Sequence, residues 1–258
     1  MIISDLYKTI ITSNDTRINI LNNREIEIII KLMDYNNVLV KNKNVLVTCK
    51  NGVFTSYNNT NTNTYTTITS TNSKTFNTGA TGILKIKFKA DNSTIGYSVI
   101  SANNTNLLIE NYRDTGWVDV TFKNGFRNYY YYPLSNSDVN YFNEYKPVRF
   151  RCYNRVVEIR GIFTNIGTTD YTMDSSASTE RPFASIPSAY APSSDIMQLQ
   201  QGSNGERFYV LVTTNGELKF AKNTDTQYKT VPHSSYNDTL GYDVGNWLHC
   251  NVIYLSNI

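Results

Sequence analysis

Apolar and polar side chains alternate with a period of two along most of this chain, and this pattern limits the fold more than any other feature. The clearest case is ILKIKFKA, from Ile83 to Ala90, where every second residue is apolar and three lysines stand between. Such alternation places the apolar residues on one face of a strand and the lysines on the other. No segment of ten or more residues has apolar positions at helical spacing. The sequence therefore predicts an almost entirely β protein.

Other segments extend this prediction. Glu25 to Met33 is expected to form a strand that ends in a turn at Asp34 to Asn37, and Val45, Val47 and Cys49 are expected to share one strand face. Asn makes up about one residue in eight and Tyr numbers 20, both above ordinary globular usage. Tyr favours strands, and Asn tolerates the positive φ angles of tight turns.

Charge and hydropathy restrict the partners. Lys+Arg 24 against Asp+Glu 21 gives a net charge of only +3, so we expect no nucleic-acid partner. No run approaches the roughly 20 apolar residues that span a bilayer, and we expect no membrane insertion. The N-terminus lacks the basic start and the apolar stretch of a secretory signal.

The stretch from Trp117 to Phe220 contains four strand patterns in a recognisable order: WVDVTFKNGF, VRFRCYNRVVEIRG, FASIPSAYAP and RFYVLVTTNGELKF. With its tryptophan strand, Asn-Gly turn, arginine-flanked hairpin and proline loop, this order resembles the C-terminal head domain of tailed-virus fibres and baseplate proteins. Ala189 and Ala191 depart from the family's pattern, in which glycine and arginine are usual at these two places.

The first half of the chain is similar, over about residues 16 to 105, to the immunoglobulin-like sandwiches of invasins, adhesins and fibre stalks. Polar residues interrupt the strand patterns between Asn103 and Thr115. We therefore expect an all-β protein with two domains: an N-terminal immunoglobulin-like β-sandwich over residues 1–110, followed by a C-terminal antiparallel β-sandwich head domain over residues 111–258.

Residues that carry chemistry are few. The three cysteines, Cys49, Cys152 and Cys250, lie in strand patterns and are expected to be buried thiols, although a Cys152–Cys250 bond stays open. His249 and Cys250 would point to opposite faces of a strand, and His233 lies in a different setting, so we expect no metal site.

No motif of a nucleotide cofactor or a catalytic serine is present. We expect no cofactor and no catalytic residues. Glycan hydrolysis would need two carboxylates across a cleft, and the spacing of the candidates selects no pair among Asp119, Glu144, Glu158 and Glu206. Solvent-exposed acids on strand faces are the favoured interpretation.

Four consecutive tyrosines, Tyr129, Tyr130, Tyr131 and Tyr132, form the candidate ligand-binding feature. On a strand, two rings would lie on each face, and one pair would be exposed. The other pair would belong to the core, and the exposed pair would lie at a domain interface, at a subunit interface or at a glycan-binding surface, since Tyr offers a large apolar face and a hydroxyl.

The resemblance implies a virion structural adhesion protein: a tail-fibre or baseplate receptor-binding component that recognises a host cell-surface polymer, expected to be a glycan, without catalysis. Heads of this family are commonly homotrimers, so the implied partners are a host glycan or protein receptor, further copies of the chain, and other virion tail proteins. The implied location is the virion tail, after synthesis in the host cytoplasm without a signal peptide. A host-encoded surface adhesin module and a glycan-degrading fibre enzyme are the alternatives.

Overall fold

The protein is all β. A computed structural model describes residues 7–60, 62–129, 147–166, 171–172, 181–205, 207–221, 230–231, 235–237, 242–244 and 247–258. Every described element is a strand apart from three short 3-10 helices, which confirms the expected fold class. The chain divides into two compact units between Asp114 and Thr115, here called unit 1 and unit 2. This division falls within the polar stretch from Asn103 to Thr115.

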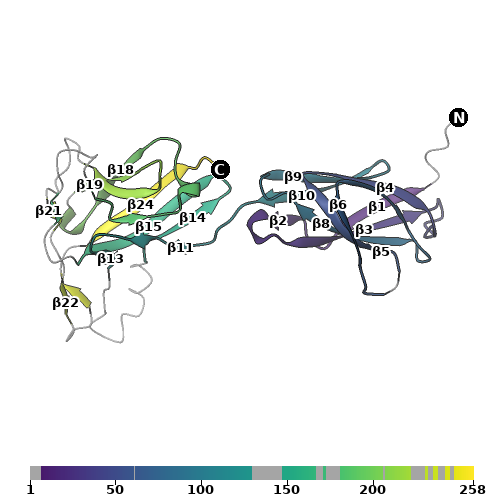
Figure 1. Ribbon diagram of the computed structural model, residues 1–258, viewed down its shortest axis with the longest axis horizontal. Coiled ribbons are helices and arrows are strands. Elements are labelled where there is room, and N and C mark those ends of the chain that lie inside the picture. The colour runs from purple at the N-terminus through teal and green to yellow at the C-terminus, as the bar shows by residue number, and fades with distance from the viewer. Residues whose placement is uncertain are drawn as a thin grey trace. The chain divides into compact units, whose positions relative to one another are not determined.

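Unit 1 consists of two five-stranded sheets, with orders β1-β3-β8-β5-β6 and β2-β10-β9-β4-β7 (Figure 1). Neighbouring strands pair antiparallel, except for β2, which runs parallel to β10. A short 3-10 helix, η1, follows β2. The elements are β1 (Lys8–Ser13), β2 (Arg17–Asn19), η1 (Ile20–Asn22), β3 (Glu25–Met33), β4 (Asn44–Lys50), β5 (Gly52–Asn58), β6 (Thr66–Thr71), β7 (Ser73–Asn77), β8 (Ile83–Ala90), β9 (Gly96–Ala102) and β10 (Thr105–Tyr112).

The alternating pattern of unit 1 becomes its core. In β8 the four alternate residues from Leu84 to Ala90 are buried, as the sequence predicts. The three lysines between them are half-buried, and the Lys87 ammonium lies 3.9 Å from Glu27 and over the ring of Tyr65. The predicted strand from Glu25 to Met33 is also confirmed. Burial of these apolar faces, at ~25 cal/mol per Å², is the main force that holds the two sheets together.

Asparagine forms the tight turns. All seven described non-glycine residues with positive φ are asparagines, which fits the ability of this side chain to occupy the left-handed region. Three of them lie between consecutive strands: Asn37 between β3 and β4, Asn51 between β4 and β5, and Asn154 between the strands Arg149–Tyr153 and Val156–Asn165. The high asparagine content therefore supplies the backbone angles that a protein of many short strands requires.

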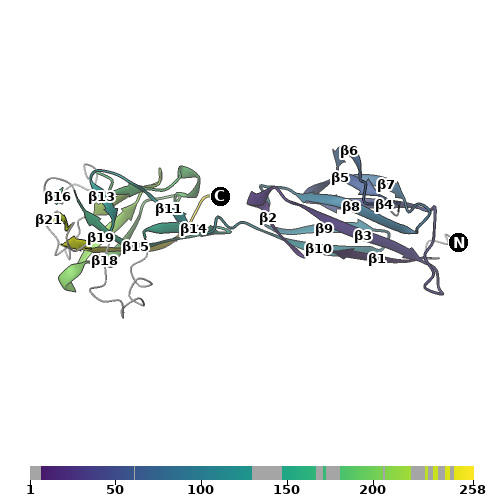
Figure 2. The same cartoon turned by 90° about the horizontal axis from the view of Figure 1, so that it is seen from below.

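Unit 2 also contains two five-stranded sheets (Figure 2). The first, called the β15 sheet, has the order β11-β14-β15-β13 with β24 on the other edge of β15, and the second, called the β19 sheet, has the order β12-β17-β20-β19-β18. Their strands are β11 (Val118–Asp119), β12 (Thr121–Phe122), β13 (Phe126–Asn128), β14 (Arg149–Tyr153), β15 (Val156–Asn165), β17 (Ala184–Ser185), β18 (Ile196–Gln201), β19 (Arg207–Val212), β20 (Glu217–Ala221) and β24 (Leu248–Leu255).

Short elements complete the description of unit 2. Two 3-10 helices flank β18, and two small two-stranded pairs join β16 to β21 and β22 to β23. These elements are η3 (Ser188–Tyr190), η4 (Ser203–Gly205), β16 (Tyr171–Thr172), β21 (Thr230–Val231), β22 (Ser235–Asn237) and β23 (Tyr242–Val244).

The segment from Trp117 to Phe122 departs from the single strand that the alternation of its side chains predicts. The alternation places Val118, Val120 and Phe122 on one strand face, but the structure has two short strands in different sheets: β11 pairs with β14, and β12 pairs with β17. The chain passes from one sheet to the other at Val120, which is buried. Val118 remains 39% exposed at the edge of the β15 sheet.

Phenylalanine rings fill the core between the two sheets of unit 2. Phe163 from β15 stacks on Phe183 with ring centroids 4.4 Å apart, and Phe126 and Phe220 pack around this pair. Such aromatic pairs contribute about 0.5–1.5 kcal/mol each beyond the area they bury. The final strand, β24, places Leu248, Cys250, Val252 and Tyr254 in this core, so the C-terminal strand is an integral part of the fold.

The two sheets of unit 2 meet where β24 lies beside β18, here called the seam. Two isolated bridges, Pro192 with Ser256 and Gly202 with Leu248, join the chain on either side of it. Between these bridges the side-chain amides of Gln198 and Gln200 hydrogen-bond to backbone groups of β24. The backbone N–H and carbonyl groups of Asn251 and Ile253 on this edge of β24 are therefore bonded by side chains of β18 and not by its backbone. This edge of the sheet is not left open.

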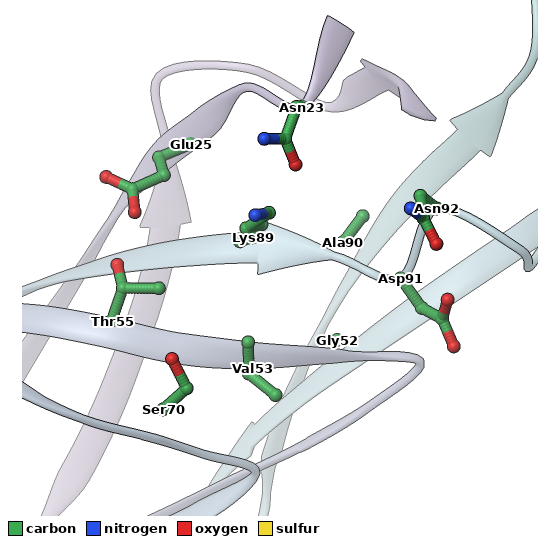
Figure 3. A pocket seen from close by; sticks show the side chains of 10 residues that line it. All are labelled: Asn23, Glu25, Gly52, Val53, Thr55, Ser70, Lys89, Ala90, Asp91 and Asn92. Atoms are coloured by element: carbon green, nitrogen blue, oxygen red, sulfur yellow. The ribbon is translucent and has the colours of Figure 1, made fainter. Parts of the chain in front are cut away.

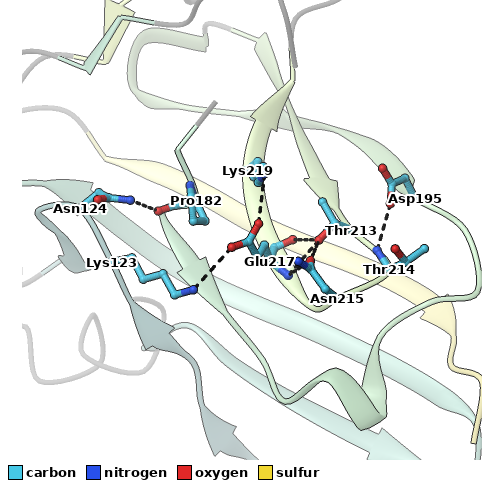
Figure 4. Close-up of polar contacts among 9 residues, drawn as sticks. All are labelled: Lys123, Asn124, Pro182, Asp195, Thr213, Thr214, Asn215, Glu217 and Lys219. Carbon is cyan, nitrogen blue, oxygen red and sulfur yellow. Dashed lines mark hydrogen bonds and ion pairs between the residues drawn. The ribbon is translucent and has the colours of Figure 1, made fainter. Parts of the chain in front are cut away.

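The turn between β19 and β20 is held by polar contacts (Figure 4). The backbone N–H of Glu217 donates to the Thr213 hydroxyl at 3.1 Å, and Gly216 takes a φ of +85°. The Glu217 carboxylate lies 3.1 Å from Lys219 and 3.7 Å from Lys123. The hydrogen bond from Lys219 is the largest cause that lowers the pKa of Glu217. This cluster fixes the hairpin against the turn that follows β12.

Candidate functional site

The tyrosine run lies mostly outside the described residues. The strand β13 ends at Asn128, and Tyr129 is half-buried, with its backbone N–H donating to Ile162 at 3.0 Å. Tyr130, Tyr131 and Tyr132 are not among the described residues. The prediction that this run binds a ligand therefore stays a prediction.

The two described candidate carboxylates form ion pairs with arginines. Asp119 lies 2.6 Å from Nε of Arg149, and Glu158 lies 3.5 Å from Arg160. The other candidates, Glu144 and Glu206, lie outside the described residues. The described acids thus have an electrostatic role on a solvent-facing sheet surface.

The three cysteines are buried and form no disulfide bond. Cys152 and Cys250, whose pairing the sequence leaves open, are both reduced and buried, as is Cys49. Burial raises the pKa of Cys250 to about 12, so its thiol is protonated at neutral pH. His249 points outward while Cys250 points into the core, as predicted; His233 is outside the described residues. Within the described part of the chain no three His, Cys, Asp or Glu side chains gather to hold a metal ion.

A pocket on the outer surface of the β15 sheet brings an aromatic ring together with two cationic groups. It has a volume of about 310 Å³ and is lined by Trp117, Pro147, Arg149 and Arg160, and it is called the Trp117 pocket below. The guanidinium carbon of Arg160 lies 4.0 Å from the centroid of the Trp117 ring, within the range of a cation–π contact. No acidic residue is among the four that line it.

The hairpin β14–β15 places the two arginines. Arg149 lies five residues before the two-residue turn Asn154-Arg155, and Arg160 lies five residues after it. A hairpin with such a turn therefore brings these two residues directly opposite each other, and they are cross-strand partners. Both project from the solvent-facing side, because their neighbours Phe150 and Ile159 are buried.

Two like charges directly opposite on neighbouring strands destabilise a sheet by about 0.2–1 kcal/mol. Trp117 and Asp119 offset this cost, since one stacks on Arg160 and the other bonds to Nε of Arg149. Because Asp119 bonds to Nε, the two terminal nitrogens of Arg149 lie outside this contact and can donate hydrogen bonds to a ligand. Each arginine side chain is 45% exposed, so the two guanidinium groups are held in place by neighbours and remain accessible to a ligand.

A second depression lies in unit 1 (Figure 3). It has a volume of about 370 Å³ and is lined largely by polar side chains, with Glu25 opposite Lys89 across the strands. The Asp91 carboxylate accepts from the backbone N–H and the hydroxyl of Ser93 at 2.9 and 2.8 Å, and these bonds lower the pKa of Asp91. No aromatic ring is among its ten lining residues, so it offers less for a specific ligand than the Trp117 pocket.

In the sequence, Trp117 and the arginine-flanked hairpin are recognised only as parts of a family pattern. The pocket that they form was not predicted. The signal was present: two arginines at equal distance from a turn must face each other. The stacking of Arg160 on Trp117 leaves no such signal, because Trp117 precedes the short strand β11 and lies outside this hairpin.

No family model matches the chain, and no curated protein matches it. Among solved structures, domains 5-6 of the S-layer protein SbsC align over 98% of this chain and 99% of that chain, with 9% sequence identity and a TM-score of 0.26. A TM-score this low carries no argument about this chain. Among the described residues, no helix has the length and apolar character needed to cross a membrane.

Proposed function

We propose that this protein is a non-catalytic adhesion protein that binds a cell-surface glycan in the Trp117 pocket. The observation that carries the proposal is the combination, in one pocket, of an indole ring with two arginines fixed on paired strands. Sugar-binding sites use aromatic faces for apolar contact and a few placed polar groups for orientation. Strands hold such groups in one geometry, so little ordering remains to oppose binding.

We further propose that the protein acts as a tail-fibre or baseplate component of a virus that infects a bacterium or an archaeon. The support for this assignment is the order of sequence segments from Trp117 to Phe220, which resembles the head domains of tailed-virus fibres. A host-encoded surface adhesin with the same pocket is the alternative, and the binding chemistry would be the same.

Weak single-site binding would be strengthened if several copies act together, because multivalency raises the effective concentration of each further site. We propose a homotrimer. One surface on the β15 sheet favours self-association: Tyr153, Val156 and Leu255 are cross-strand neighbours in a single row and are 37%, 45% and 63% exposed. Adjacent exposed apolar side chains of this kind are common at protein interfaces. The tyrosines from Tyr129 to Tyr132 remain a second proposed contact surface.

Binding of the intact chain to an array of bacterial surface polysaccharides tests the glycan proposal. We expect saturable binding to at least one polysaccharide and a loss of at least about tenfold, or about 1.4 kcal/mol, in the Trp117→Ala variant. Tyr35→Ala is the matched control, because Tyr35 is 87% exposed in unit 1 and lies outside the pocket. Binding that survives the Trp117 substitution unchanged would contradict the proposal.

A reducing-end assay on any bound polysaccharide separates adhesion from cleavage. We expect no new reducing ends after prolonged incubation. Their release by the wild-type chain, and its loss in an Asp119→Asn or Glu158→Gln variant, would favour a glycan-degrading enzyme over an adhesin.

A further inference from the structure

The Trp117 pocket lies at one end of a row of side chains that crosses four strands. Asp119, Arg149, Arg160 and Asn251 are successive cross-strand partners on β11, β14, β15 and β24. Directly opposite residues of a sheet project from the same face, so all four lie on the solvent-facing side. Neighbouring strands are about 4.8 Å apart, and the row from Arg149 to Asn251 therefore spans about 10 Å.

A further depression, distinct from the one in unit 1, lies at the other end of this row. It has a volume of about 410 Å³ and lies at the seam, and its lining consists of Leu199, Gln200, Gln201, Arg207, His249 and Asn251. Asn251 thus belongs to both the row and this depression. The lining includes a cationic group, side-chain amides and an imidazole, and no carboxylate.

The floor of the row is rigid. The strands β14, β15 and β24 are joined by regular antiparallel pairing over their common length. Gln200 fixes the Asn251 backbone from the other side, with hydrogen bonds of 2.8 and 2.9 Å. The two depressions therefore keep a constant separation, as subsites for one elongated ligand would require.

The charges indicate the class of ligand. Arg149 and Arg160 at one end and Arg207 at the other are lining cations, and guanidinium groups bind oxyanions through paired hydrogen bonds. Asp119 and Glu158 each pair with one of the first two arginines, and a neutral sugar would leave the guanidinium nitrogens outside these ion pairs unused. A carboxylate or a phosphate would use it, and the aromatic face of Trp117 suits a ring-containing repeat better than an acyclic phosphate chain.

We propose that the two depressions are subsites of one trough that binds a linear acidic polysaccharide across the strands, with the carboxylates of non-adjacent uronic acid units at the arginines of the two depressions. This inference rests on the proposed glycan-binding function and narrows its ligand. Arg149 and Arg160 receive one carboxylate, Asn251 contacts the intervening sugar units, and Arg207 faces a further acidic unit beyond them.

Calorimetric titration of the intact chain with galacturonic acid oligomers of increasing length tests the trough. We expect affinity to rise with length and to level off once both depressions are filled, with a total gain of at least about tenfold over the monosaccharide. Asn251→Ala should remove most of this gain. Arg160→Gln should weaken every member of the series, and Arg24→Gln, at an exposed ion pair of unit 1, should weaken none.

Two further series separate the possible failures. Neutral galactose oligomers that bind as tightly as the acidic ones would overturn the acidic ligand and leave the glycan proposal standing. Glycerol phosphate oligomers that bind in their place would assign the anion to phosphate and overturn the carboxylate. Affinity that does not depend on length would overturn the trough. If all three series and the polysaccharide array fail to bind, the proposed function falls as well.

Discussion

The side-chain amide of Gln200 forms two hydrogen bonds with the backbone of Asn251: it donates to the carbonyl at 2.9 Å and accepts from the N–H at 2.8 Å. The side chain thus takes the place of a neighbouring strand. Gln198 repeats the arrangement two residues earlier, on Ile253. These two glutamines hold the edges of the two unit 2 sheets together where no backbone ladder joins them.

Gln200→Ala should lower the free energy of unfolding of unit 2 by about 1–3 kcal/mol, because it leaves a partly buried N–H and a carbonyl of β24 without their side-chain partners. Urea unfolding followed by circular dichroism measures the change. Gln201→Ala, at an exposed position of the same strand, should change it by less than about 0.5 kcal/mol. Equal effects of the two substitutions would show that the seam does not depend on the Gln200 amide.

Gly161 is required by the backbone beside it. Its φ is +145°, and a Cβ there would lie 2.5 Å from the Cα and N atoms of Val148. We expect Gly161→Ala to destabilise unit 2 by about 2–4 kcal/mol through strain and displacement of β14. Gly116→Ala, which has a φ of +63° and open space around it, should cost only about 1–2 kcal/mol. Thermal unfolding of both variants measures the difference. Equal losses of stability would contradict the role given to the space around Gly161.

The His249 imidazole should make the stability of unit 2 depend on pH. Burial lowers its pKa below the ordinary value of 6.5, so the unfolded chain binds this proton more readily than the folded chain does. The contribution of the neutral imidazole to the stability of unit 2 is fully present above pH 6.5 and is lost as the pH drops toward the pKa of His249 in the folded chain.

His249→Gln should therefore reduce the loss of stability between about pH 7 and pH 5. Urea unfolding at several pH values provides the measurement. His233→Gln is the matched control, because the chain contains only these two histidines. An unchanged pH slope in the His249 variant would show that this group does not carry the dependence.

The sequence predicts those parts of the fold that depend on local pattern. The strands around Leu84 and the hairpin around Asn154-Arg155 follow from alternation and turn chemistry alone, and the structure confirms both. The break at Val120 could not be predicted, because the same alternation fits one strand or two strands in different sheets. Only the pairing of β11 with β14 and of β12 with β17 distinguishes them.

The candidate site was harder to predict than the fold, because it depends on contacts between distant segments. The opposition of Arg149 and Arg160 could be read from the turn between them. The stacking of Arg160 on Trp117 and the bonding of Gln200 to Asn251 join residues that are far apart in the chain. These contacts are made by individual side chains, and a period of two in the sequence carries no information about them.

The intrinsic fluorescence of Trp117 tests the central claim most directly. The chain has two tryptophans, so Trp247→Phe leaves Trp117 as the sole indole and reports on the candidate pocket alone. Titration of this variant with an acidic oligosaccharide should produce a saturable change in emission that Arg160→Gln weakens by at least about tenfold. If calorimetry detects saturable binding while the Trp117 emission stays constant, the ligand binds elsewhere and the account of this pocket is wrong.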